Sequence, residues 1–171
     1  TEDAIAKLPA DATYRILFSA HGLPKKIIEA GDPYACHVER TAAAVRRRLK
    51  NPDADHVVCY QSRVGPMEWL QPYTEDEIKR AGADGVALVV VPVAFVSEHS
   101  ETLVELDIDY AERAAAAGVP HYVRAPTVNA DPAFIATLAD IVTNAGETGT
   151  GPAGVACGAE YGDCPCRKAV A

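Results

Sequence analysis

The chain has 171 residues, of which 49% are hydrophobic and 23% charged, a composition typical of one globular domain with its own core. Its formal net charge of -8 argues against the basic surface that nucleic-acid binding requires, so we expect no nucleic-acid partner. The longest apolar run, Val86 to Val96, contains Pro92 and is shorter than the roughly 20 residues of a membrane-spanning helix.

Buried strands are predicted where β-branched and apolar residues cluster: Tyr14 to Ala20, His56 to Gln61, Val86 to Ala94 and His121 to Ala125. A helical pattern follows each strand. We expect helices from the Asp32 cap to Asn51, from Thr74 to about Gly82, from about Ser100 to Ala117, and from Asp131 onward. The last helix carries a set of apolar residues that we expect to point inward: Phe134, Ile135, Leu138, Ile141 and Val142.

This alternation of strands and helices predicts an α/β fold, a Rossmann-like four-stranded parallel sheet flanked by helices. We expect residues 1–145 to form this domain and residues 146–171 to form a flexible connector and a cysteine-bearing tail, because 146–154 is rich in Gly, Thr, Pro and Ala. Ligands of such sheets bind beyond the carboxyl ends of the strands, so the residues that follow each strand are the candidates for chemistry.

Polar side chains follow the first three predicted strands. They are His21 after the first strand, Gln61 at the end of the second with Ser62 and Arg63 after it, and His99 and Glu101 after the third. Imidazole and carboxylate ligands together suit a divalent transition metal such as ferrous iron, and an imidazole also accepts protons near neutral pH. A loop histidine bonded to the backbone is the plain alternative for His21.

An acidic row is predicted on the third helix, where Glu101, Glu105 and Asp109 are spaced four residues apart. A solvated acidic face would explain this spacing equally well. The position of the row beside His99, at the edge where His21 emerges, favours a path that conducts a cation.

Three strings in this sequence resemble signature segments of the ferrochelatase family, in the same order: Ile16 to Pro24, Gln61 to Pro66 and Phe95 to Asp107. The resemblance implies one half, the carboxy-terminal half, of a two-domain chelatase that inserts ferrous iron into a porphyrin to make haem and releases two protons. Thr1 is not an initiator methionine and no leader follows it, so we expect a truncated or processed chain. Because the first half implied by the resemblance is absent from these 171 residues, we expect the chain alone to be inactive or nearly so.

The resemblance also implies roles for individual residues. His21 would be the active-site metal ligand and proton acceptor, and Glu101 the acidic residue that faces it. Glu105 and Asp109 would form the acidic path for iron or protons. The residues expected to bind substrate are Gln61, Ser62, Arg63 and His99. Possible peripheral membrane contact is implied by the family alone.

Three cysteines crowd into the tail: Cys157, Cys164 and Cys166. Three close thiols suit an iron–sulfur cluster or zinc, and unligated thiols are also possible. The resemblance implies a [2Fe-2S] cluster whose fourth ligand comes from the absent amino-terminal half, so we expect no cluster in this chain alone. The odd count of five cysteines argues against a disulfide framework and favours a reducing, cytoplasmic location.

Three other functions compete with this interpretation. A half-size chelatase for sirohydrochlorin or a cobalt corrinoid precursor would build its cleft by homodimerising. An iron–sulfur redox or sensing module would make the strand-end histidine incidental. A haem-binding module is disfavoured because cleft carboxylates suit an entering cation better than an apolar macrocycle.

Overall fold

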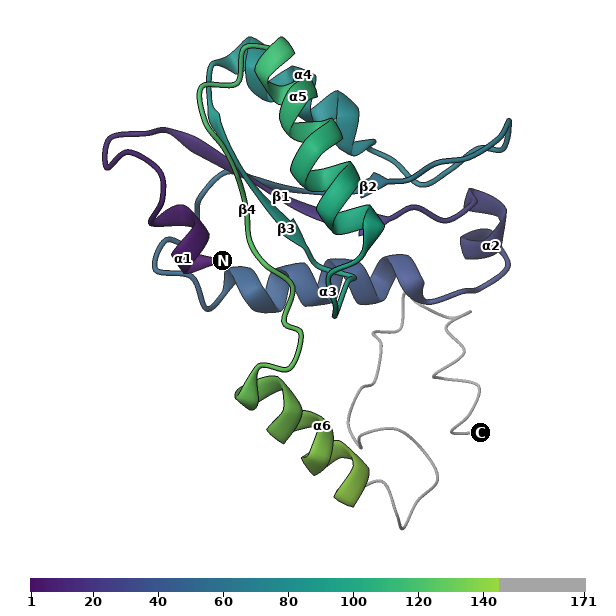
Figure 1. The fold of residues 1–171 in the computed structure, drawn as a ribbon. Helices are drawn as coiled ribbons and strands as arrows, with labels where there is room; N and C mark the ends of the chain where they lie inside the picture. The colour runs from purple at the N-terminus through teal and green to yellow at the C-terminus, as the bar shows by residue number, and fades with distance from the viewer. Residues whose placement is uncertain (145–171) are drawn as a thin grey trace.

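The computed structural model describes residues 1–144, which form a parallel sheet with helices on both faces (Figure 1). The strands are β1 (Tyr14–His21), β2 (His56–Gln61), β3 (Ala87–Pro92) and β4 (Tyr122–Arg124), in the order β2-β1-β3-β4. The predicted α/β fold class and the four strands are therefore confirmed. The third and fourth strands are shorter than their apolar runs, and the expected connector and tail lie outside the described residues.

The sheet register brings the predicted site residues to one edge. In β1 and β2, His21 pairs with Gln61, so both strands end at the same level. In β1 and β3, Ser19 pairs with Pro92, and the chain then leaves β3 toward His99. Because β1 lies between β2 and β3, its last residue has polar loops on both sides.

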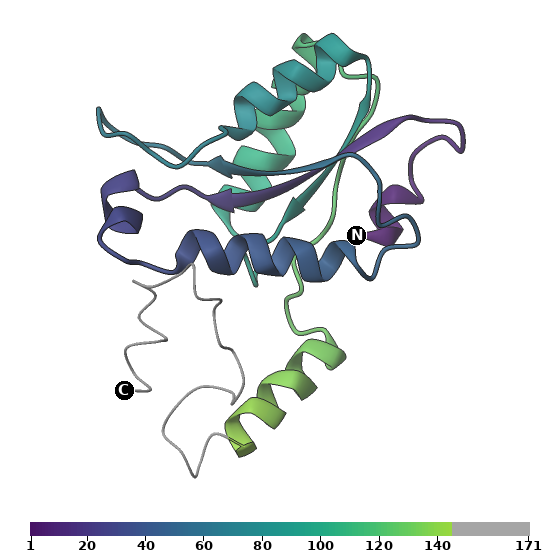
Figure 2. The same cartoon turned by 180° about the vertical axis from the view of Figure 1, so that it is seen from behind.

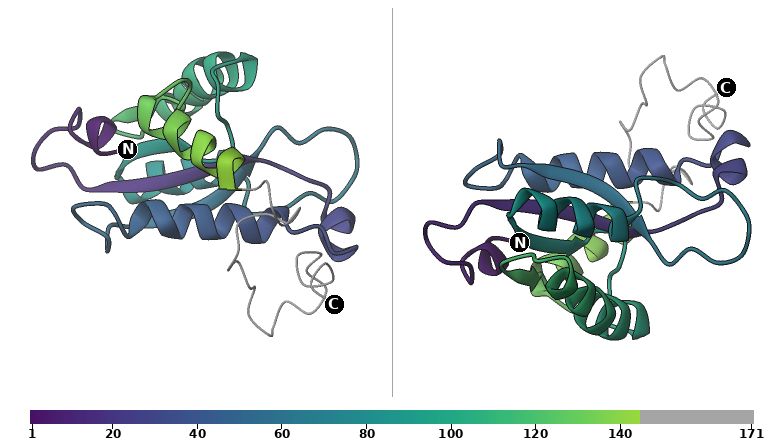
Figure 3. Two further views of the ribbon diagram at one scale, coloured as in Figure 1. Left: turned by 90° about the horizontal axis from the view of Figure 1, so that it is seen from below. Right: turned by 90° about the horizontal axis from the view of Figure 1, so that it is seen from above.

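Helices cover both faces of the sheet (Figures 2 and 3). One face carries α4 (Thr74–Asp84), the π-helix η1 (Glu101–Asp109) and α5 (Tyr110–Ala116), packed on a core that includes Leu17, Leu88 and Leu106. The other face carries the short α1 (Glu2–Ile5) and α3 (Tyr34–Arg46), packed on a core that includes Phe18 and Val89. Alternate residues of β1 thus enter opposite cores, as the two-residue strand period requires.

Helix boundaries differ from the sequence prediction in three places. The one-turn helices α1 and α2 (Lys25–Glu29) were not predicted, because neither has the length to show a period. Helix α3 ends at Arg46, before the expected Asn51, although Asp32 accepts the backbone N–H of Tyr34 as an N-terminal cap should. Helix α4 continues through Gly82 to Asp84 and is capped by Gly85, whose φ of 67° is the left-handed conformation typical of that position.

The predicted α-helix from Ser100 to Ala117 is wrong in its first half. Residues Glu101–Asp109 form a π-helix, and only Tyr110–Ala116 are α-helical. Long π-helices are rare and are frequently found at functional sites. Contacts outside the helix stabilise this one, since Tyr122 donates a hydrogen bond to the carbonyl of Leu106 at 2.7 Å.

The inward apolar face predicted for the last helix is also wrong. Helix α6 (Pro132–Asn144) extends away from the sheet in Figure 1 and has no buried residue. Of the side chains predicted to point inward, Phe134 is half-buried and the other four are exposed, from 41% for Leu138 to 75% for Val142. Within residues 1–144, no helix combines the length and the hydrophobicity needed to cross a bilayer.

Candidate active site

The imidazole of His21 is held by the backbone that follows it. Its Nδ1 atom lies 2.6 Å from the carbonyl oxygen of Gly22, which can only accept a hydrogen bond. Nδ1 therefore carries a proton, and in the neutral ring Nε2 keeps a free electron pair. Histidines that bind metals are commonly oriented by this kind of second bond. The side chain is 36% exposed, so Nε2 is open to a ligand.

Glu101 faces this nitrogen from the first turn of η1. Its Oε1 atom lies 3.7 Å from Nε2 of His21, and its side chain is 39% exposed. A neutral Nε2 and a carboxylate both offer electron pairs, so the space between them attracts a proton or a metal cation. The backbone N–H of Glu101 donates to Nδ1 of His99 at 3.2 Å, which makes His99 a support for the start of the helix.

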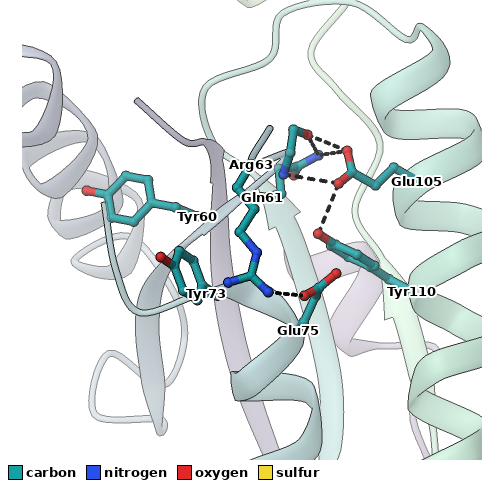
Figure 4. A pocket seen from close by; sticks show the side chains of 8 residues that line it. Tyr60, Gln61, Arg63, Tyr73, Glu75, Glu105 and Tyr110 are labelled. Carbon is teal, nitrogen blue, oxygen red and sulfur yellow. Dashed lines mark hydrogen bonds and ion pairs between the residues drawn. The ribbon is translucent and has the colours of Figure 1, made fainter. Parts of the chain in front are cut away.

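Glu105 is anchored on the end of β2 (Figure 4). It accepts hydrogen bonds from Nε2 of Gln61 at 3.0 Å, the backbone N–H of Ser62 at 3.1 Å and the Tyr110 hydroxyl at 3.0 Å, and a short one from the Ser62 hydroxyl. Burial and the adjacent Glu105 carboxylate raise the pKa of Tyr110, so its hydroxyl stays protonated and donates. These four hydrogen bonds therefore hold the Glu105 side chain in one position.

A buried polar chain orients Gln61 from behind. The hydroxyl of Ser19 donates to Oε1 of Gln61 at 2.8 Å and lies 3.1 Å from the hydroxyl of Thr74. With its oxygen occupied, the amide group turns its nitrogen toward Glu105 and the backbone carbonyl of Glu101, which is 3.2 Å away. Gln61 therefore connects β1, β2 and both carboxylate-bearing turns of η1.

Arg63 lies apart from this cluster. Its guanidinium stacks over the ring of Tyr73 at 4.1 Å, with Nη2 3.3 Å from Glu75. A small pocket of about 130 Å³ opens here, and Figure 4 shows the side chains that line it: Tyr60, Gln61, Ser62, Arg63, Tyr73, Glu75, Glu105 and Tyr110. The pocket thus adjoins Glu105 rather than His21.

The structure unites part of the predicted site. His21 and Glu101 face each other, and Gln61, Ser62 and Glu105 form a second group. Asp109 is exposed at the other end of η1. Among residues 1–144, no three His, Cys, Asp or Glu side chains gather as a ready metal site, so the first pair supplies two ligands at most. Cys157, Cys164 and Cys166 lie outside the described part of the chain.

Sequence reasoning missed three residues that surround His21. The buried Trp69 places its ring centroid 6.4 Å from that of His21, and the Tyr34 hydroxyl donates to the His21 carbonyl at 2.8 Å. Gly22 packs tightly, because an added Cβ would lie 3.1 Å from the Gln61 carbonyl oxygen and 3.2 Å from the Trp69 ring, so these neighbours would have to move by a few tenths of an ångström. Only the glycine in the tight loop could have been noticed from the sequence.

Fold and site together define an α/β protein with a cation-accepting pair at the carboxyl edge of a Rossmann-like sheet. The fold is similar to the solved structure of a cobalamin (vitamin B12) biosynthesis CbiX protein from Marinobacter aquaeolei VT8. That similarity has a TM-score of 0.55 at 18% identity and covers 77% of this chain and 95% of the other.

The sequence comparisons identify the family. The ferrochelatase family profile matches residues 1–146, and the chain belongs to the ferrochelatase family. It is 49% identical over 166 residues to a ferrochelatase of Caulobacter vibrioides, covering 95% of this chain and 48% of the relative. It is 53% identical over 157 residues to a ferrochelatase of Phenylobacterium zucineum, covering 90% and 45%. The chain thus spans about half the length of these relatives.

Proposed function

We propose that this chain is the carboxy-terminal half of a ferrochelatase, which inserts ferrous iron into a porphyrin to make haem and releases two protons. The observation that carries the proposal is the facing pair of His21 Nε2 and the Glu101 carboxylate, 3.7 Å apart at the open edge of the sheet. Family membership supports these substrates, and the geometry is consistent with His21 as a base and with the pair as ligands of the iron.

The chemistry needs a base beside the metal. Two pyrrole N–H bonds break as iron–nitrogen bonds form, so two protons must leave the macrocycle. The bond from Nδ1 to the Gly22 carbonyl keeps the proton of the neutral ring on Nδ1, so Nε2 of His21 has a free electron pair. Nε2 can therefore accept a pyrrole proton or bind iron. Nε2 cannot do both at once, so iron held between His21 and Glu101 would pass to the porphyrin nitrogens as Nε2 takes up one pyrrole proton and the Glu101 carboxylate takes up the other.

We propose that the acidic row continues from this pair. Asp109 is exposed at the distal end of η1, and Glu105 lies between it and Glu101. Gln61 and Ser62 support substrate binding by holding Glu105, and His99 by holding the turn that carries Glu101. Arg63 is 51% exposed and could pair with a porphyrin carboxylate in place of Glu75.

A second half of the protein would complete the cleft. The chain covers 48% of the Caulobacter vibrioides relative. Helix α6 supports the same proposal, because a helix of 13 residues with an exposed apolar side is marginal without a packing partner. We therefore propose that this chain has little activity without that half.

We also propose a [2Fe-2S] cluster in the complete protein, with three of its four thiolate ligands from Cys157, Cys164 and Cys166. Cys59 does not suit the fourth position, because burial raises its pKa to about 12 and so disfavours the thiolate. Iron and acid-labile sulfide content, compared with Cys164→Ser, tests this. A reducing, cytoplasmic location and peripheral membrane contact remain parts of the proposal.

The direct test is insertion of ferrous iron into protoporphyrin by the complete protein and by this chain alone. We expect activity in the former and little in the latter, and a loss of about 10²–10⁴-fold for His21→Ala. His37→Ala is the matched control, since His37 is exposed on α3. Activity of the chain alone would indicate a half-size, homodimeric chelatase, and a His21→Ala variant with full activity would exclude the proposed role.

A further inference from the structure

Arg124 joins the two ends of the segment that carries Glu101. It is the last residue of β4, and its side chain is 10% exposed. Nε and Nη2 grip the Asp107 carboxylate at 2.5 and 2.6 Å, while Nη1 donates to Glu98 at 3.0 Å. Residues 98–107 contain Glu101 and most of η1. One planar guanidinium thus ties the loop before η1 and the helix itself to the sheet.

The loop end of this segment is held by more than one bond. The Glu98 carboxylate also accepts the backbone N–H of Thr127 at 3.0 Å, and the backbone N–H of Glu98 donates to Asn129 at 3.2 Å. The next residue, His99, accepts the N–H of Glu101. A continuous series of contacts therefore runs from Arg124 to the turn that faces His21.

A π-helix needs such bracing. Its hydrogen bonds close a wider ring than those of an α-helix, and long examples are rare. Gln61 and Ser62 hold η1 on the side of β2 through Glu105, and Arg124 holds it on the side of β4 through Asp107. Loss of either contact would let the helix shift or rewind, and Glu101 would move relative to His21.

We propose that Arg124 is a positioning residue that sets the place of the Glu101 carboxylate opposite Nε2 of His21, and so the metal affinity of that pair. The inference rests on the proposed function, because it assumes that the pair binds a divalent metal. Residues that orient metal ligands without touching the metal typically change affinity by about 10–100-fold when they are replaced.

The probe is Co²⁺ alone, titrated into the complete protein without porphyrin and followed by its visible spectrum. We expect Arg124→Gln to weaken the His21-dependent binding of Co²⁺ by about 10-fold or more, and Arg124→Lys to weaken it less, since an ammonium keeps the charge but not the planar fork. Arg113→Gln is the matched control, because Arg113 on α5 is 55% exposed and pairs with Glu75 of α4 rather than with Glu98 or Asp107, so its loss should leave Co²⁺ binding unchanged.

If Arg124 had a purely structural role, its replacement would lower the stability of the protein without a specific effect on metal affinity. In insertion assays below the unfolding range, we therefore expect Arg124→Gln to raise KM for iron while KM for porphyrin stays the same. Should Arg124→Gln fail to fold, Asp107→Asn removes one charge at a partly exposed position and should shift KM for iron in the same direction.

Two outcomes separate the hypotheses. His21-dependent Co²⁺ binding that Arg124→Gln and Asp107→Asn leave intact would overturn the positioning role and leave the proposed function standing. Absence of His21-dependent binding in the unchanged protein would contradict the proposed metal pair itself, and the positioning role with it.

Discussion

The carboxamide nitrogen of Gln61 donates to the carboxylate of Glu105 at 3.0 Å, and this bond joins the end of β2 to the middle of η1. The same nitrogen reaches the backbone carbonyl of Glu101 at 3.2 Å. Gln61, which was expected to bind substrate, thus forms hydrogen bonds to η1. Its position shows how a strand end fixes the helix that carries the acidic row.

Replacement of Glu105 by alanine should destabilise the complete protein by about 3 kcal/mol, because the Gln61 amide and the Ser62 and Tyr110 groups would lose their acceptor. Asp109→Ala is the control on the same helix, where an exposed side chain should contribute within about 0.5 kcal/mol. Urea unfolding followed by circular dichroism measures both. Equal stability of the two variants would show that the Glu105 contacts contribute nothing net.

The ionisation of Glu98 predicts a loss of stability in acid. Burial opposes its charge, but the Thr127 N–H, the Thr102 hydroxyl and Arg124 outweigh burial and lower the pKa from 4.5 to about 2. A carboxylate with a lowered folded-state pKa stabilises the protein above its unfolded pKa, and this contribution is lost as the pH falls from about 4.5 to about 2.

Urea midpoints measured across this pH range should therefore fall more steeply for the unchanged protein than for Glu98→Gln, which has no charge to lose. Parallel curves for the two proteins would show that Glu98 titrates normally and that Arg124 does not stabilise its charge.

Gly82 should tolerate a methyl group less well than Gly85. A Cβ on Gly82 would lie 2.1 Å from the backbone oxygen of Ala117, so Gly82→Ala should separate α4 from the end of α5 and cost about 3 kcal/mol. Gly85 has open space but a left-handed φ of 67°, so Gly85→Ala should cost about 1 kcal/mol. Thermal unfolding of both variants tests the order, and the reverse order would contradict the close helix contact.

The exposed side of α6 should become buried in the complete protein. Leu138→Glu is therefore expected to destabilise that protein by about 2 kcal/mol or more, since it would place a charge in an apolar contact. Ala136→Glu, on the opposite side of the same helix, should be near neutral. Urea unfolding of the two variants decides, and equal stabilities would mean that α6 stays in solvent.

The sequence alone determined the class of fold and the edge at which the site lies. Apolar runs of strand length that alternate with capped helical patterns leave a parallel sheet as the arrangement that buries both, and parallel strands end at the same edge. His21 and Gln61 lie at the ends of two strands and Glu101 follows a third, so the sequence predicted that they would meet at one edge of the sheet.

Only the tertiary structure showed which of the site residues contact one another and in what geometry. Spacing cannot reveal that η1 is a π-helix, because contacts of Glu105 and Leu106 with distant residues stabilise it against the α-helix that local propensity favours. Nor could the apolar pattern of α6 show whether its partner lies within residues 1–144. Local sequence sets the elements, and contacts between residues far apart in the chain set the exact geometry of the carboxylates.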